Sequence, residues 1–196
     1  MNINIKKGIA SQVSLPINKA GFTLVEMMVT VAIAAILAGI GIPNLQRTLQ
    51  DNQMTSRYNE FLSSLNLTRN TAITQGAPAA LCKRNASGSG CAANSADWQY
   101  GWLVFSDKNN NGTVDAGEKI LQDKSDINGN VTMHYSRAIN RISYSAEGYA
   151  YGFAGTFTFC DQRGDSARKG MVISQNGRVR KAESGDNLST CPENGE

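Results

Sequence analysis

Residues 22–42 read FTLVEMMVTVAIAAILAGIGI, an apolar run that contains one charge, Glu26. As an α-helix, a run of about 21 residues is about 31 Å long, enough to cross the hydrocarbon core of a membrane. Lys6, Lys7 and Lys19 precede it, and the positive-inside rule places this basic end on the cytoplasmic side. The sequence therefore predicts a membrane-spanning helix near the N-terminus.

The order of polar and apolar segments is unusual for an export signal. A cleavable secretory signal carries its apolar stretch before the cut site. Here the polar and basic residues 1–21 come first and end in Asn18-Lys-Ala-Gly21. Cleavage after Gly21 removes residues 1–21 as a leader and leaves the apolar helix in the mature protein. The alternative is an uncleaved signal anchor that tolerates Glu26 near the membrane interface.

The run Gly21-Phe22-Thr23-Leu24-Val25-Glu26 resembles the processing site of type IV prepilins and type II secretion pseudopilins. The resemblance implies that a prepilin peptidase cuts after Gly21 and methylates Phe22. It also implies that Glu26 neutralises the amino terminus of a neighbouring subunit during assembly. Such pairing would offset the cost of about 2.5–3.5 kcal/mol that a charged side chain carries in lipid.

An amphipathic pattern continues the helix over residues 43–76. Apolar residues recur at three- and four-residue steps, with charged residues between them. These apolar positions are Leu45, Leu49, Tyr58, Phe61, Leu62, Leu65, Ala72 and Ile73. We expect residues 39–43, which hold two glycines and a proline, to weaken the helix, and Gly76 and Pro78 to end it. A coiled-coil dimer is the alternative for this segment, although its heptads are few.

Residues 77–196 have the pattern of a β-rich globular head. Short runs with β-forming residues are separated by Gly, Asn and Ser clusters. The candidate strands are Ala79–Lys83, Trp98–Phe105, Lys119–Gln122, Val131–Ser136, Arg141–Tyr144, Thr156–Cys160, Met171–Ser174 and Arg178–Ala182. We predict an α+β pilin fold, in which a long N-terminal helix, apolar over 22–42 and amphipathic over 43–76, packs on an antiparallel sheet or two-sheet head.

The chain contains four cysteines, Cys82, Cys91, Cys160 and Cys191. An even number in an exported chain indicates two disulfides, for which three connectivities exist. Proximity in sequence favours Cys82–Cys91 and Cys160–Cys191. Reduced, buried thiols are the alternative, and zinc is disfavoured because no Cys-x-x-Cys pair occurs.

Residues 107–118 match the spacing of a twelve-residue calcium loop. Oxygen-bearing side chains stand at positions 1, 3, 5, 9 and 12, namely Asp107, Asn109, Asn111, Asp115 and Glu118, and Gly112 is at position 6. The flanking residues resemble strands, not the two helices of an EF-hand. A polar hairpin loop whose Asn and Asp side chains bond their own backbone is therefore the favoured interpretation, with calcium as the alternative and otherwise no cofactor.

A basic C-terminal hairpin is predicted at Gly170–Lys181, where Asn176-Gly177 separates two apolar runs. Arg178 and Arg180 share one face of the outgoing strand, and Lys181 follows them. Three further cations precede the hairpin: Arg163, Arg168 and Lys169. Residues 160–181 carry a net charge of +4 and residues 182–196 a net charge of −4.

The run Gly177-Arg178-Val179-Arg180 resembles the Gly-Arg-x-Arg motif of the FimT/GspH-like minor pilin family, and Gly101–Phe105 and Cys160–Gly164 also resemble that family's head. In members that act in natural transformation this motif binds DNA. The resemblance implies that Arg178 and Arg180 contact phosphates of double-stranded DNA with help from Lys181. The alternative is a solvated edge strand whose cations prevent aggregation. Beyond residue 21 the chain is neutral, so any attraction to DNA must come from this local patch.

No catalytic constellation is apparent. His134 is the only histidine, and no nucleophile or orienting acid pairs with it in sequence. We therefore expect no enzyme, but a minor pilin that supports pilus assembly and whose partners are other pilins, the prepilin peptidase, the inner membrane and DNA. The head is expected in the periplasm and, after assembly, at the cell surface. A minor pseudopilin of a type II secretion system is the alternative.

Overall fold

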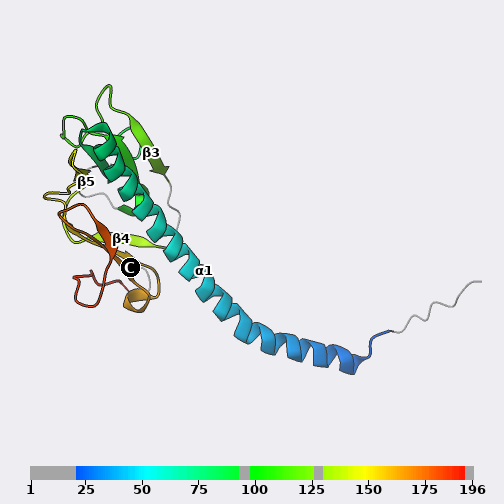
Figure 1. The fold of residues 1–196 in the computed structure, drawn as a ribbon. Coiled ribbons are helices and arrows are strands. Elements are labelled where there is room, and N and C mark those ends of the chain that lie inside the picture. Colours follow the sequence, from blue (N-terminus) through cyan, green and yellow to red (C-terminus); the bar gives the residue numbers. More distant parts are fainter. Residues whose placement is uncertain (1–20, 93–97, 126–129, 193–196) are drawn as a thin grey trace, which may run out of the picture. The chain divides into compact units, whose positions relative to one another are not determined.

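The structure is a computed structural model that describes residues 21–92, 98–125 and 130–192 (Figure 1). The chain divides into two compact units, Met1–Asn44 and Leu45–Glu196. The predicted leader up to residue 20, with its three lysines, lies outside the described residues. The boundary between the two units falls inside helix α1 (Leu24–Gln75).

The first unit holds the apolar part of α1. Thr23 begins the helix: its Oγ1 accepts the Glu26 N–H at 3.2 Å, and its own N–H donates to Glu26 Oε2 at 3.0 Å. This reciprocal pair is a capping box. Side chains along this part of the helix are exposed, and α1 is long and apolar enough to cross a membrane. Pro43 lies inside α1, so the predicted weak point does not end the helix.

In the second unit, α1 packs against the head through one face. Met54, Phe61, Leu65 and Ala72 on this face have no exposed surface. Gly76 adopts a φ of 59°, and the Ala77 N–H donates to Ala72 O at 3.3 Å, which closes the last helical turn. The predicted end of the helix at Gly76 is confirmed.

The head contains two four-stranded antiparallel sheets, as the α+β pilin fold predicts. The first has the order β3-β2-β1-β5, with β1 Ala79–Lys83, β2 Gly101–Ser106, β3 Ile120–Ser125 and β5 Arg141–Tyr144. The second has the order β4-β6-β7-β8, with β4 Thr132–Tyr135, β6 Gly155–Cys160, β7 Lys169–Ile173 and β8 Val179–Lys181. All eight predicted strands are present. Residues 98–100 form a 3₁₀ turn before β2, so that strand starts later than predicted.

One core lies between α1 and the inner faces of both sheets. Phe61 is at its centre and makes edge-to-face contacts with Trp102 and Phe157 at centroid distances of 5.0 and 4.5 Å. A second cluster covers the outer face of the first sheet: Ala80, Cys82, Leu103 and Phe105, with Val114 packed against it. Strands β1 and β2 are therefore buried on both faces, and the 107–118 loop covers part of them.

Candidate functional site

The predicted processing site lies at the start of the first unit. Gly21 and Phe22 precede α1 and are exposed, and the Phe22 side chain is 82% exposed. Glu26 follows one helical turn later and its carboxylate is held by Thr23. This capping role of Glu26 was not predicted from the sequence, although Thr-x-x-Glu is its usual signature. Cleavage after Gly21 stays a prediction.

The basic hairpin forms as predicted from β7 and β8. Ile173 pairs with Val179 and Val172 with Arg180 across the two strands. The turn depends on Gly177, which has a φ of 75° that disfavours other residues. Arg69 on α1 donates from its Nε to Gly148 O at 3.0 Å, beside this turn.

Arg180 does not project freely into solvent. Its Nη1 and Nη2 donate to the two carboxylate oxygens of Asp186, each at 2.8 Å, and Asp186 also accepts the Glu183 N–H at 2.7 Å. This bidentate pair lowers the pKa of Asp186 to about 2 and raises that of Arg180. The acidic tail therefore forms an ion pair with one of the two motif arginines, whose side chain stays exposed.

The tail that carries Asp186 is built into the head. The Ser189 N–H donates to Thr158 Oγ1 on β6 at 2.9 Å, and the Cys191 N–H donates to Asp165 Oδ1 at 2.8 Å. Cys191 is also disulfide-bonded to Cys160. These contacts bury Thr158 completely and cover the outer face of the second sheet.

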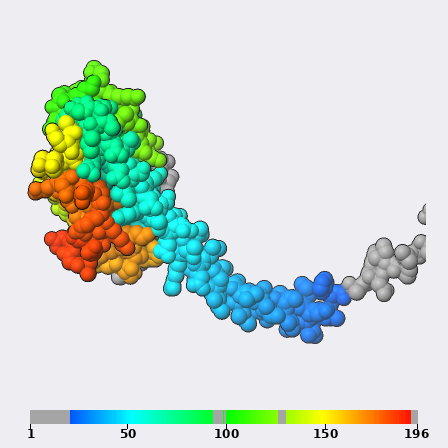
Figure 2. Space-filling model, in the orientation of Figure 1, coloured from blue at the N-terminus to red at the C-terminus, as the bar shows by residue number. Residues whose placement is uncertain are grey.

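The three cations before the hairpin are also engaged. Arg163 forms ion pairs with Asp161 at 2.6 Å and with Asp51 on α1 at 2.7 Å. Arg168 pairs with Asp165 at 3.0 Å, and Lys169 Nζ donates to Thr55 Oγ1 on α1 at 2.7 Å. The segment 163–169, orange in Figure 2, lies beside this part of α1.

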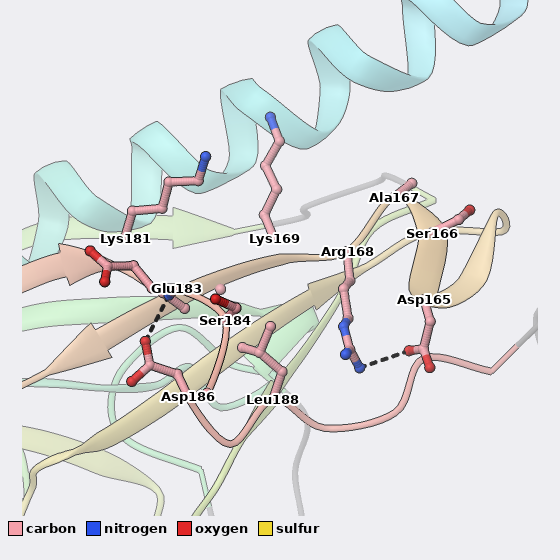
Figure 3. A pocket seen from close by; sticks show the side chains of 13 residues that line it. Asp165, Ser166, Ala167, Arg168, Lys169, Lys181, Glu183, Ser184, Asp186 and Leu188 are labelled. Carbon is pink, nitrogen blue, oxygen red and sulfur yellow. Dashed lines mark hydrogen bonds and ion pairs between the residues drawn. The ribbon is translucent and has the colours of Figure 1, made fainter.

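Lys181 and Arg178 differ from the other four cations of the predicted patch. Both side chains are exposed, and within the described residues neither forms an ion pair. In Figure 3, Lys181 and Lys169 extend on the same side of a shallow groove, and Arg168 turns toward Asp165. Three of the six cations, Arg163, Arg168 and Arg180, are in ion pairs. Two of them pair with acids outside residues 160–181, Asp51 and Asp186, so the net charge of +4 overstates the free positive charge.

Both disulfides have the connectivity that sequence proximity favoured. Cys82–Cys91 links β1 to the following loop, and Cys160–Cys191 links β6 to the tail. No free cysteine is found in the chain. The alternative of reduced thiols is not what the structure shows.

Residues 107–118 connect β2 to β3 as a polar hairpin loop. Asn109 and Asn111 donate from Nδ2 to Asp115 Oδ2 at 2.8 and 2.7 Å, and Glu118 accepts the Lys108 and Asp115 N–H groups. The flanking strands and the Asn-based turns agree with the hairpin interpretation.

His134 lies on β4 with an exposed side chain. Its Nε2 is 3.4 Å from Thr132 Oγ1, the one side-chain contact found for it among the described residues.

Two family models match the chain. The prokaryotic N-terminal methylation motif matches residues 17–42, and the model of type II transport protein GspH matches residues 58–177, more than half of the chain. The chain belongs to the GspH family of pilin-like proteins. This GspH-family pilin matches no curated protein sequence.

Two solved structures share the fold of this GspH-family pilin. Both are crystal forms of the type IV minor pilin FimU of Pseudomonas aeruginosa strain PAO1. The first has a TM-score of 0.56 and 17% identity and covers 75% of this chain and 98% of FimU; the second has a TM-score of 0.50 and 18% identity and covers 70% and 99%. At this identity the likeness concerns the fold alone.

The residues that sequence reasoning missed are the acidic and hydroxyl partners of the patch. Asp51 and Thr55 come from α1, more than 100 positions before the cations that they bind. No local sequence pattern predicts contacts between residues so far apart in the chain. Asp186 is different, because the net charge of −4 after residue 181 signalled an acidic tail close to a basic strand.

Proposed function

We propose that this GspH-family pilin is a minor subunit of a type IV pilus and is needed for pilus assembly. The apolar half of α1 is the observation that supports this role. Its side chains are exposed throughout the first unit, and exposed apolar surface of this extent needs either lipid or neighbouring helices. A membrane before assembly and a filament afterwards supply these two environments in turn.

Processing and location follow from the same proposal. A prepilin peptidase removes residues 1–21 and methylates Phe22, the inner membrane holds residues 22–42, and the head lies in the periplasm until other pilins take up the helix. The Glu26 carboxylate then neutralises the charged amino terminus of an adjacent subunit. The methylation-motif match over residues 17–42 supports this sequence of events.

The assembly role is tested with the Glu26→Gln variant in cells. We expect normal amounts of the protein in the membrane but loss of incorporation into sheared pili, because Gln cannot neutralise an amino terminus. Glu147→Gln, an exposed change of the same type in the head, is the matched control. Mass spectrometry of the wild type should find methylated phenylalanine at the start of the mature chain, and an intact leader would refute the proposal.

The alternative is a minor pseudopilin of a type II secretion system, which the GspH family model favours by its description. Deletion of the gene separates the two functions. Loss of surface pili with unchanged secretion of extracellular enzymes supports the pilus, and the reverse result supports the secretion system.

We further propose that the head binds the phosphate backbone of double-stranded DNA through Arg178, Lys181 and Arg180. The first two are exposed and free of ion pairs among the described residues. Arg180 already shows the bidentate geometry that suits a phosphate, with Asp186 in the place of the phosphate. DNA must displace Asp186 to use Arg180, so the tail weakens binding.

Gel retardation with the full chain in detergent tests this proposal. Arg178→Gln should weaken binding and reduce the salt slope by about 1, because one phosphate contact is lost. Asp186→Asn should strengthen binding, because it frees Arg180 and removes a negative charge. Lys119→Gln, an exposed charge change beside β3, is the control. Absence of retardation at low salt, for the wild type and for Asp186→Asn, excludes DNA binding by this patch.

A further inference from the structure

The loop between β2 and β3 combines a cation-binding spacing with an unusual buried carboxylate. Asp107 opens the loop and has no exposed surface. Its Oδ2 accepts the Gly112 N–H at 3.0 Å, whereas its Oδ1 is buried without a hydrogen-bond partner. Because both oxygens belong to one carboxyl group held against the loop's own backbone, Oδ1 also lies at the loop. The positive charge of Arg141 acts on this carboxyl group, but no hydrogen bond reaches Oδ1. A buried acceptor left without a partner is costly, and it indicates a place for a ligand.

The other oxygen-bearing side chains of the loop gather around Asp115. Asn109 and Asn111 approach its Oδ2 from two directions, at 2.8 and 2.7 Å. These two amide N–H groups supply the positive partial charge that a cation would supply. Within the described residues, no three acidic, histidine or cysteine side chains already converge as metal ligands do. A cation at this place would therefore replace the two amide N–H groups at Asp115.

The amide oxygens of the loop are suited to such an exchange. Asn109 Oδ1 accepts one backbone N–H, from Asn111 at 3.2 Å, and retains a second lone pair. Asn111 Oδ1 accepts from the N–H and the hydroxyl of Thr113. The Thr113 hydroxyl also lies 3.4 Å from Asp115 Oδ1, a second acceptor. It can therefore give up its hydrogen bond to Asn111 Oδ1 and leave that amide oxygen available to a cation.

The backbone has the turn that a calcium loop requires. Gly112, at the sixth position, has a φ of 76°, a conformation in which glycine is strongly favoured. The loop is also fixed to the head: Arg141 Nη1 donates to Asn111 O at 3.0 Å, and Ser143 Oγ donates to Asn110 Oδ1 at 3.0 Å. Arg141 is a cation close to the site, and its charge opposes tight binding.

We propose that residues 107–118 form a calcium site carried on a β-hairpin. The ligands are the carboxylates of Asp107, Asp115 and Glu118 and the amide oxygens of Asn109 and Asn111. An all-oxygen set with flexible side chains suits Ca²⁺ better than transition metals, which prefer nitrogen and sulfur, or Mg²⁺, which demands stricter octahedral geometry. With three carboxylates and one opposing arginine, we expect a Kd in the range of extracellular modules, about 10⁻⁴–10⁻³ M.

Calcium at this place would stabilise the head as a whole. Val114, inside the loop, packs on the cluster that covers the outer face of β1 and β2. The loop also contacts β5 through Arg141 and Ser143. Ordering of the loop therefore reinforces three strands of the first sheet, and binding should appear as a higher unfolding temperature.

Thermal unfolding of the full chain in detergent tests the site, with calcium chloride titrated against EDTA and with magnesium chloride as comparison. We expect Tm to rise by about 3–6 °C in about 10 mM Ca²⁺ and by clearly less in equal Mg²⁺. Isothermal titration calorimetry of the wild type should give one calcium per chain. A Tm that does not respond to calcium, together with no binding heat at this concentration, overturns the proposal, as does an equal response to magnesium.

Variants that replace a carboxylate by an amide show whether the calcium-dependent rise in Tm comes from this loop. Asp115→Asn and Glu118→Gln keep the shape of the side chains, and each should abolish most of the calcium response. Glu147→Gln removes the same charge outside the loop and should leave the response unchanged. The Tm of each variant in EDTA shows whether it folds. Variants that fold and still show the full wild-type response also overturn the assignment of the site.

Discussion

Individual side chains of this pilin show how strongly tertiary partners change the meaning of a charged motif. Arg178 and Arg180 stand two positions apart in one short motif, yet one is free of ion pairs among the described residues and the other is clamped by Asp186. A tertiary partner also explains a polar residue in the core. Ser64, a polar residue on the buried face of α1, accepts the indole N–H of Trp102 at 2.8 Å.

We predict that the ion pair with Arg180 keeps the Asp186 carboxylate ionised at a pH where an ordinary aspartate is protonated. The pKa of Asp186 is lowered to about 2 by Arg180, so this contact contributes stability above the ordinary Asp pKa of about 3.9 and loses it as the pH falls toward 2. Titration of the Asp186 carboxyl carbon by NMR should give a midpoint near 2 in the wild type. In Arg180→Gln the midpoint should return toward the ordinary range, and an unchanged midpoint would show that the pair does not form.

Replacement of Ser64 tests the buried hydrogen bond. Ser64→Ala leaves the Trp102 indole N–H without an acceptor in a site where both residues have no exposed surface. We expect a loss of about 1–3 kcal/mol in the free energy of unfolding, measured by urea denaturation. Ser56→Ala on an exposed part of the same helix should change stability by less than about 0.5 kcal/mol.

At the scale of elements, the C-terminal tail acts as a covering layer for the second sheet. It follows β8, returns along β6 through the Ser189 and Thr158 contact, and ends at the disulfide with Cys160. The 107–118 loop covers the outer face of the first sheet through Val114. Each sheet therefore has α1 on its inner side and an irregular segment on its outer side.

The two disulfides should differ in their contribution to stability. Cys160–Cys191 closes a segment with a sequence separation of 31, and Cys82–Cys91 one of 9. In the chain-entropy model these loops correspond to about 3.7 and 2.7 kcal/mol. We expect Cys160→Ser with Cys191→Ser to lower the free energy of unfolding by more than the Cys82→Ser, Cys91→Ser pair does, as measured by chemical denaturation.

The tail disulfide has a second consequence, for the basic patch. Loss of Cys160–Cys191 should loosen the tail and weaken the hold of Asp186 on Arg180. If the patch binds DNA, this double variant should bind more tightly than the wild type in gel retardation. Equal or weaker binding by a folded double variant would contradict an inhibitory role of the tail.

The whole molecule consists of one apolar helical unit and one unit with its own core. The buried residues of α1 begin at Met54, so the core belongs to the second unit. The apolar side chains of residues 22–42 are exposed and contribute nothing to that core. In the proposed assembly, this division would allow the helix to move from lipid to filament while the head remains folded.

The division predicts that residues 45–196 fold alone. This fragment should be soluble without detergent and should unfold at nearly the same temperature as the full chain in detergent, because no core residue is removed. Full-length protein should aggregate when detergent is withdrawn. Circular dichroism and light scattering check both statements, and a fragment that is unfolded would show that the first unit supports the head.

The amino-acid sequence by itself determined the helix, its end at Gly76 and the presence of the eight strands, and it favoured the disulfide pairing that the structure then showed. These features depend on local periodicity, turn residues and short separations, which a single chain displays directly. Only the tertiary structure decided which cations of the patch are paired, that Asp107 is buried with an unused oxygen, and that the tail covers β6. Such features require residues distant in sequence to meet, and their pairing depends on how the sheets and α1 pack together.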